Sequence, residues 1–304
     1  MSETGHMTGL RGELRANESM ARHVSWRAGG PAARAYLPAD RDDLATFLRQ
    51  LPPAEPILFM GLGSNSLVRD GGFRGTVILT HAAAKRPSLV DGRICADVGV
   101  ASPKVARFAA NNNLANAEFL AGIPGCIGGA LAMNAGCYGS ETWEIVESVE
   151  TVDRRGHFRT RPASDFEIGY RHCGLKEGAI GTDEWFVAAH FNLPAGNGDD
   201  SRARIKELLT KRIASQPLSL PNAGSVFRNP PGDYAARLIE SCGLKGLERG
   251  GARVSEKHAN FIVNPKGAAR ACDIEGLIES VRATVREKSG IDLHPEVRIV
   301  GDPA

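Results

Sequence analysis

The sequence lacks any run of about eighteen apolar residues, the length that a membrane-spanning helix needs. It also lacks the basic, apolar, small-residue order of a secretory signal at its start. We therefore expect a cytoplasmic protein that does not enter a membrane. Lysine and arginine form no block, and the net charge is only +2 in 304 residues, which argues against a nucleic-acid partner.

Cysteine is present without any pattern typical of metal or disulfide sites. The six cysteines form no C-x-x-C pair and no metal-ligand spacing, and six in so long a chain are more typical of small buried hydrophobic residues than of a disulfide framework. We expect free thiols and no metal. The cysteines are Cys95, Cys126, Cys137, Cys173, Cys242 and Cys272.

Hydrophobic residues at 42% and charged residues at 24% are ordinary for a globular protein, so disorder is excluded. The length allows about two domains, or three small ones. Residues 1–20 are interpreted as a polar, partly helical N-terminal segment (the lead). Within it, Gly5-His-Met7 has the composition of a cloning remnant.

Hydrophobic periodicity predicts short mixed α/β units. We expect an exposed linker at residues 194–200, whose composition is rich in glycine, asparagine and aspartate. In the last expected helix Asp273 is the predicted N-cap and Gly290 the residue that ends it. Helices are expected at 40–51, 102–113, 201–215, 233–242 and 273–289, and strands near Ile57, Val77, 93–98, 146–153, 185–192 and 296–300.

The most informative segment is 121–142, where six glycines fall within eighteen residues and Glu141 is the only charged residue. Such a run lets backbone N–H groups approach a ligand and form a nest around an anion. A glycine loop that serves only turns and packing is the simpler alternative for one cluster alone. A pyrophosphate-bearing cofactor is the leading interpretation because a second cluster exists.

That second cluster, Gly61-Leu-Gly-Ser-Asn-Ser66, follows an apolar run. It is not a dinucleotide fingerprint, because Ser66 stands where the third glycine is needed and the next strand follows too soon for a crossover helix. It is not a Walker A loop, because no Gly-Lys-Ser/Thr follows. We expect loops between strands to hold the phosphates.

Two polar segments stand where a core would not need them. In 220–230, Ser225 follows a glycine, but the G-x-S-x-G elbow is absent, and from this segment alone a turn-forming serine is the simpler interpretation. In 254–264, His258 is a candidate general base, and a hydrogen-bonded structural histidine is the simpler interpretation there.

Taken in order, these segments resemble the UDP-N-acetylenolpyruvoylglucosamine reductases, over nearly all of residues 24–301. The joint order is specific, whereas each motif alone is weak. The motifs are Gly61-Leu-Gly-Ser-Asn65, Gly122-Ile-Pro-Gly-Cys-Ile-Gly-Gly129, Met133-Asn-Ala-Gly136, Gly169-Tyr-Arg171, Asn222-Ala-Gly-Ser-Val-Phe-Arg-Asn-Pro230, Gly243-Leu-Lys-Gly246, Ser255-Glu-Lys-His-Ala-Asn-Phe261 and Pro295-Glu-Val-Arg298.

The resemblance implies an α+β (mixed α/β) fold: a two-part FAD-binding domain of the vanillyl-alcohol-oxidase-like type and a C-terminal α+β substrate domain. The implied domains are 1–81 with 297–304 returning to it, 82–198, and 199–296. It also implies non-covalent FAD held by the glycine clusters. The FAD contacts carried over are Gly61, Gly63, Ser64, Asn65, Ser66, Leu67, Gly122, Ile123, Pro124, Gly128, Gly129, Ala130, Met133, Asn134, Ala135 and Gly136.

The implied reaction is the reduction of UDP-N-acetylglucosamine enolpyruvate to UDP-N-acetylmuramate, with NADPH as the reductant, by a monomer. This reaction belongs to peptidoglycan synthesis, and so to cell-wall biogenesis, cell shape and cell division. Arg171, Ser225 and Glu296 match the catalytic positions. The arginine holds the substrate carboxylate, the serine gives a proton to C2, and the glutamate works beside the arginine. Tyr170 and Asn229 complete the implied substrate contacts.

Two departures limit this resemblance. Cys173 replaces a serine that many relatives carry, and no tyrosine lies between Arg171 and Ser225, so the chain resembles the type that lacks a tyrosine loop over the nucleotide. Two alternatives stay open: an FAD-dependent oxidase of the same scaffold, and a flavin- or sugar-nucleotide-binding protein without catalysis.

Overall fold

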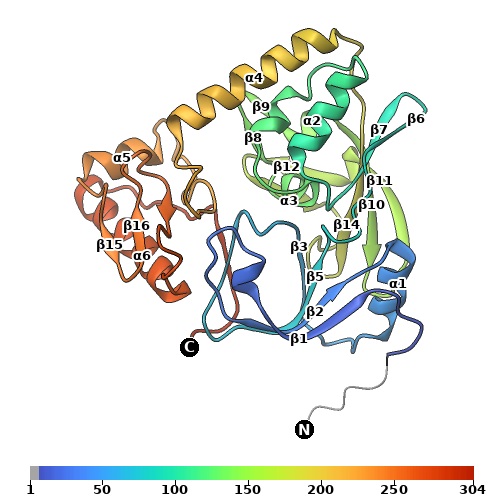
Figure 1. Cartoon of the computed structure of the whole chain (residues 1–304), viewed down its shortest axis with the longest axis horizontal. Coiled ribbons are helices and arrows are strands. Elements are labelled where there is room, and N and C mark those ends of the chain that lie inside the picture. Colours follow the sequence, from blue (N-terminus) through green and yellow to red (C-terminus); the bar gives the residue numbers. More distant parts are fainter. Residues whose placement is uncertain (1–6) are drawn as a thin grey trace. The chain divides into compact units, whose positions relative to one another are not determined.

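The computed structural model describes residues 7–304, in which the chain forms two compact units. Unit 1 contains residues up to 16, 34–61 and 75–209, and unit 2 contains residues 17–33, 62–74 and 210–304. The chain passes from one unit to the other within β1, β2, β5 and α4, and in the loop between β3 and β4; Figure 1 labels most of these elements. No helix in the described part of the chain is both long and apolar enough to cross a bilayer.

Unit 1 contains a four-stranded sheet in the order β1-β2-β5-β3. Strands β3 and β5 are parallel, with Ile57 opposite Thr76. Helix α1 buries Leu44, Phe47 and Leu48 in the adjoining core, and the side chain of Asp40 caps this helix by accepting from the N–H of Asp43. The elements are β1 (Glu13–Ser19), β2 (Pro31–Leu37), α1 (Arg41–Gln50), β3 (Ile57–Met60) and β5 (Phe73–Leu79).

Unit 1 also contains an antiparallel five-stranded sheet in the order β11-β10-β14-β7-β6. Figure 1 shows α2 and α3 beside these strands, and the two helices share one apolar core with the sheet. The elements are β6 (Ser88–Val90), β7 (Arg93–Asp97), α2 (Ser102–Asn111), α3 (Ile127–Ala132), β10 (Val146–Asp153), β11 (Phe158–Pro162) and β14 (Glu184–Phe191).

Short elements complete unit 1. The hairpin of β12 (Phe166–Gly169) and β13 (His172–Leu175) has Tyr170 and Arg171 at its tip. A smaller hairpin joins β8 (Gly136–Cys137) to β9 (Ser140–Glu141). The single turns of 3-10 helix are η2 (Glu118–Gly122), η3 (Thr142–Glu144) and η4 (Ala163–Asp165).

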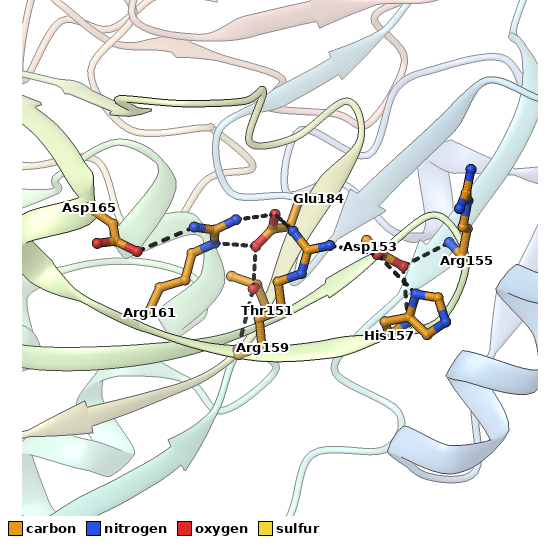
Figure 2. Close-up of polar contacts among 8 residues, drawn as sticks. All are labelled: Thr151, Asp153, Arg155, His157, Arg159, Arg161, Asp165 and Glu184. Carbon is orange, nitrogen blue, oxygen red and sulfur yellow. Dashed lines mark hydrogen bonds and ion pairs between the residues drawn. The ribbon is translucent and has the colours of Figure 1, made fainter.

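An ion-pair network lies between β10, β11 and β14 of unit 1 (Figure 2). The guanidinium of Arg161 donates two hydrogen bonds to Glu184, of 2.6 and 2.8 Å, and Thr151 donates a third. The side chain of Glu184 is only 7% exposed. Burial alone would raise the pKa of this carboxyl, but the hydrogen bonds from Arg161 and Thr151 outweigh burial and hold the pKa below its ordinary value.

Unit 2 has its core around α6, whose residues Ile274, Leu277, Ile278, Val281 and Val285 are buried. The elements are η1 (Met20–Arg22), β4 (Ser66–Val68), α5 (Ala235–Ser241), β15 (Glu248–Arg249), β16 (Ala252–Val254), β17 (Ile262–Val263), α6 (Ala271–Ser289) and β18 (Arg298–Val300). Strands β15, β16 and β17 form a small sheet, and β4 pairs in parallel with β18. Helix α4 (Gly198–Ser215) contributes residues to both units.

The expected elements are confirmed within a few residues, except in three places. The predicted lead is wrong at 13–19, because these residues pair as an edge strand, while residues 1–6 with most of the Gly5-His-Met7 segment lie outside the described residues. The linker is shorter than expected, since α4 begins at Gly198. Asp273 is not the N-cap of α6: its carboxylate accepts from the N–H of Arg270, the residue that holds that position.

Candidate active site

The glycine loop at residues 61–65 connects β3 to β4. We call it the first glycine loop, and we call the glycine-rich residues 121–142 the second glycine run. Gly63 has a φ of +59°, and a Cβ there would lie 2.2 Å from the carbonyl oxygen of His23, so only glycine fits. Among residues 7–304 no acceptor receives a hydrogen bond from the backbone N–H groups of Leu62, Gly63, Ser64 and Asn65. Consecutive donors of this kind suit an anion such as a pyrophosphate.

Within unit 2 this loop is hydrogen-bonded to β18 and to the residues just before it. The carbonyl oxygen of Asn65 accepts from the N–H of Arg298 at 3.0 Å, and its side-chain amide donates to the carbonyl oxygen of Glu296 at 3.1 Å. Ser66 lies opposite Arg298 in the parallel pairing, and Leu67 is fully buried. The loop that we predict to hold FAD and the predicted catalytic Glu296 are therefore neighbours within unit 2.

Neighbouring atoms in unit 1 require glycine at three of the six glycines of residues 121–142, and also at Gly61. A Cβ on Gly122 would lie 2.6 Å from the ring of Tyr138, and one on Gly136 would lie 2.5 Å from the carbonyl oxygen of Ser140. On Gly128 it would lie 3.0 Å from the Cβ of Val98, and on Gly61 3.0 Å from the Cβ of Cys126. Close packing therefore explains these four glycines.

Gly129 is the exception in this run. A Cβ there would meet no atom of the described chain within 4 Å, and its φ is outside the left-handed region. Its N–H, in the first turn of α3, donates to no acceptor in residues 7–304, and the residue is exposed. Neither conformation nor packing requires glycine here, so close approach by a ligand remains as the physical reason for it. This observation fits a bound FAD.

The other predicted FAD contacts of unit 1 line the same run. Ile123, Ala130 and Met133 are buried, Ala135 is half-buried, and Pro124 is exposed. Asn134 uses its whole side chain internally: the amide donates to Glu141 at 2.7 Å and to the carbonyl of Gly169 at 3.2 Å, and its oxygen accepts from the N–H of Trp143. It thereby ties the glycine run to the β12–β13 hairpin.

Arg171 sits at the tip of that hairpin with a φ of +53°, an unfavourable backbone conformation for a residue with a Cβ. Its guanidinium donates to the carbonyl oxygen of Gly136 at 3.1 Å and lies 5.1 Å from the ring centre of Tyr170. The structure therefore brings Tyr170, Arg171 and Gly136 together in unit 1. Cys173, in place of the expected serine, is buried in the core of this unit.

Ser225 and Glu296 lie on neighbouring segments of unit 2. The N–H of Glu296 donates to the carbonyl oxygen of Val226 at 2.7 Å, and Phe227 is opposite Pro295 in a β-bridge. Asn229, at the end of the same segment, accepts at its side-chain oxygen from the N–H of Ala235, the first residue of α5. The structure thus brings together Ser225, Glu296 and, through Glu296, Asn65.

Asn260 and Arg228 have no role in the prediction from sequence, but the structure gives each a notable environment. The buried amide of Asn260 donates to the carbonyl of Phe227 at 2.8 Å and accepts from the N–H of the same residue at 2.9 Å, which braces the Ser225 segment. Arg228 has a buried Nε that is without a hydrogen-bond partner in the described chain. Both residues lie inside the motifs that carry the resemblance, and this position was the signal from which a role could have been predicted.

The contacts of His258 are those of a hydrogen-bonded structural histidine. Its Nδ1 accepts from the N–H of Asn260 at 3.3 Å, and its ring lies edge-on to Phe261. Burial lowers the pKa of this imidazole, which favours the neutral form that such an acceptor requires.

Comparisons with known proteins agree with this geometry. Residues 32–160 match the model of an FAD binding domain, and residues 216–300 match the model described as "UDP-N-acetylenolpyruvoylglucosamine reductase, C-terminal domain". These two matches confirm the predicted fold class: an FAD-binding part is followed by a distinct C-terminal domain.

Curated relatives are similar over nearly the whole chain. The UDP-N-acetylenolpyruvoylglucosamine reductase of Nitrosospira multiformis is 57% identical over 97% of this chain and 91% of the relative. That of Legionella pneumophila (strain Paris) is 55% identical over 99% of this chain and 98% of the relative. The crystal structure of the Thermus caldophilus UDP-N-acetylenolpyruvylglucosamine reductase superposes with a TM-score of 0.78 at 30% identity, covering 95% of this chain and 99% of that one. The chain therefore belongs to the UDP-N-acetylenolpyruvoylglucosamine reductase family.

Proposed function

We propose that this protein reduces UDP-N-acetylglucosamine enolpyruvate to UDP-N-acetylmuramate with NADPH as the electron donor, in the synthesis of peptidoglycan precursors. Membership of the family makes the chain an FAD-dependent oxidoreductase. The electron donor, the atoms that react and the residues that act on them are the content of the proposal. A cytoplasmic location, a monomeric state and the three domains 1–81, 82–198 and 199–296 stay predictions.

The observation that carries the proposal is the pairing of Ser225 with Glu296 on adjoining segments of unit 2, joined by the 2.7 Å hydrogen bond from Glu296 N to Val226 O. Two motifs that are about seventy residues apart in the sequence meet there, as a shared site requires. A protein that had lost catalysis would have no need to keep a serine and a glutamate on these two adjoining segments.

Non-covalent FAD supplies the two-electron redox chemistry when it is bound. The amides of Leu62 to Asn65 in unit 2, and Gly129 in unit 1, are the groups that we propose to hold it. In the overall change the enolpyruvyl double bond gains a hydride at C3 and a proton at C2.

The chain's own residues handle the proton and the charge. The hydroxyl of Ser225 gives its proton to C2, where the negative charge that develops makes the substrate carbon a strong base. The guanidinium of Arg171 holds the substrate carboxylate through its planar fork, and Glu296 acts on the enolic group. Tyr170 and Asn229 bind the substrate, and the unsatisfied Nε of Arg228 suits its diphosphate.

Replacing Ser225 by alanine tests this assignment. We expect NADPH to bleach the bound flavin at the wild-type rate, while reoxidation by the enolpyruvyl nucleotide slows by about 10²- to 10⁴-fold, the usual contribution of general acid catalysis. Stopped-flow absorbance separates the two half-reactions under anaerobic conditions. Ser219→Ala, which changes an exposed serine nearby, is the matched control.

Three outcomes are distinct. Unchanged reoxidation in Ser225→Ala would remove the proton-donor role. Rapid reoxidation of the wild-type flavin by oxygen, without the enolpyruvyl nucleotide, would favour an oxidase of the same scaffold. A wild-type protein that NADPH does not reduce at all would favour a binding protein without catalysis.

A further inference from the structure

Three side chains capable of binding a metal lie on one face of the five-stranded sheet in unit 1. Cys95 on β7 is directly opposite His190 on β14, and His190 is opposite Ser148 on β10. Glu150 is two residues beyond Ser148, so the pleat places it on the same face. Direct cross-strand neighbours such as Cys95 and His190 lie about 4.5–5.5 Å apart at Cβ, and a diagonal neighbour such as Glu150 lies about 7–8 Å from His190, within reach of a long side chain.

The ligand atoms of these side chains converge. His190 Nε2 lies 2.9 Å from Glu150 Oε1, and the thiol sulfur, imidazole nitrogen and carboxylate oxygen all lie within 4.8 Å of one another. Ligands bound at about 2.0–2.3 Å to a tetrahedral Zn²⁺ are separated by roughly 3–4 Å, so small side-chain shifts would admit the ion.

Arg41 holds the cluster from one side. Its Nη1 donates to Glu150 Oε2 at 2.7 Å, and its Nη2 donates to Asp97 Oδ1 at 2.7 Å. Oε1 of Glu150 is thereby turned toward His190. A carboxylate ligand whose second oxygen is hydrogen-bonded is the usual arrangement around a bound metal.

The charges of the cluster suit a divalent cation. A bound Zn²⁺ would displace the thiol proton of Cys95, so that the thiolate and Glu150 supply two negative charges to balance the ion. Arg41 also pairs with Asp97, and Lys85 and Arg86 line the cavity beside the cluster. Thiolate and imidazole ligands favour zinc over magnesium or calcium.

The cluster is open to an incoming ion. Cys95, Arg41 and Asp97 line a cavity of about 510 Å³ within unit 1, and the side chains of His190 and Glu150 are 23% and 24% exposed. The opposite face of the same strands is apolar, where Ile94 and Ala189 are fully buried in the core. The core therefore does not account for the polar set.

We propose that Cys95, Glu150 and His190 form a Zn²⁺ site that leaves a fourth position to water, with Arg41 orienting the glutamate. Binding releases the thiol proton of Cys95 to solvent, because only the thiolate is a ligand. The sequence predicts no metal because the three ligands come from three strands and show no short spacing. This site is independent of the flavin chemistry proposed above.

Zinc binding to the purified holoenzyme tests the site. The protein is freed of metal with a chelator, titrated calorimetrically with Zn²⁺ in excess Mg²⁺, and then examined by X-ray absorption at the zinc edge. We expect one zinc per chain, with one sulfur at about 2.3 Å and the other ligands at about 2.0–2.2 Å. Cys95→Ser and His190→Gln should each weaken zinc binding by more than about 100-fold. Losing a residue that only hydrogen-bonds a ligand costs about 10- to 100-fold, so a larger loss indicates a direct ligand.

Cys272→Ser, which changes an exposed cysteine on α6, is the matched control and should bind zinc like the wild type. The far-ultraviolet circular dichroism and flavin content of each variant report its folding. The proposal is overturned if the wild type takes up less than one equivalent, if Cys95→Ser retains the wild-type affinity, or if the spectrum shows no sulfur ligand. The last result needs no variant, so it stands even where a substitution prevents folding.

Discussion

The side-chain amide of Asn65 donates a 3.1 Å hydrogen bond to the backbone carbonyl of Glu296, across 231 positions of sequence. A residue of the first glycine loop thus helps to set the backbone of the predicted catalytic glutamate. This hydrogen bond joins a residue predicted to bind the cofactor to a residue predicted to act on the substrate, both within unit 2.

Asn65→Ala should therefore impair more than cofactor binding. The variant loses a hydrogen bond whose net contribution is about 1 kcal/mol, and the backbone at Glu296 loses a constraint. We expect reoxidation of the reduced flavin by the enolpyruvyl nucleotide to slow by about tenfold at saturating FAD, the rate equivalent of roughly 1.4 kcal/mol. Stopped-flow kinetics measure it, with the exposed Asn192→Ala as control. A rate equal to that of the wild type would show that Glu296 does not depend on this contact.

Gly129→Ala should separate folding from FAD binding. A methyl group there meets open space and a helical backbone, so the FAD-free protein should be as stable as the wild type or up to about 1 kcal/mol more stable. The FAD dissociation constant should rise by at least about tenfold, or 1.4 kcal/mol, if a ligand occupies that space. Flavin fluorescence quenching measures the constant, and thermal unfolding measures the stability. Unaltered FAD affinity would contradict the assigned contact.

Arg161→Ala should be among the most destabilising changes in unit 1. Glu184, nearly buried, would lose its two hydrogen bonds from the guanidinium and keep only those of weaker partners. Removing one partner of a buried ion pair costs about 3–5 kcal/mol, and we expect the lower value because Arg159 and Thr151 remain. Figure 2 shows Arg155 with its guanidinium directed away from Glu184, so Arg155→Ala is the control and should stay within about 0.5 kcal/mol. Urea unfolding of both variants tests the difference.

The same carboxylate makes stability depend on pH. Because the folded pKa of Glu184 is below its ordinary value, its contribution is complete above the unfolded pKa of about 4.3 and is lost as the pH falls through the folded pKa. Glu184→Gln should therefore reduce the fall in melting temperature between pH 6 and about pH 3. Circular dichroism melts across that range measure it. Parallel curves for the variant and the wild type would show that other groups cause the acid sensitivity.

Local sequence signals predicted the elements but not their long-range partners. The apolar stripe of α6 and the left-handed Gly290 follow from helical periodicity and glycine's conformational freedom, and both are present. The start of α6 was predicted three residues too late, because a carboxylate near a helix start serves equally well as the N-cap or as the N3 residue of a capping box. Nothing within that segment shows that Arg270 precedes it in an extended conformation.

The site was predictable to the extent that its residues stand in ordered motifs. Ser225, Arg171 and Glu296 were assigned by resemblance and stay predictions, and the structure places Ser225 and Glu296 on adjoining segments. The distinction between Gly129 and Gly128 could not be predicted, because it depends on whether Val98, which follows β7 about thirty residues earlier, fills the space beside the glycine. The convergence of Cys95, Glu150 and His190 depends in the same way on strand register, which no local pattern reveals.

The parallel pairing of β4 with β18 has a consequence for biosynthesis. The partner of the first glycine loop is made much later than the loop itself: Asn65 and Glu296, which share a hydrogen bond, are 231 positions apart, and Ser66 pairs with Arg298. Ribosome-bound chains should therefore carry this loop without its final hydrogen bonds, and a premature stop codon before position 296 should yield a product that never completes it. Pulse proteolysis of stalled nascent chains would show the loop becoming protected only after β18 leaves the exit tunnel.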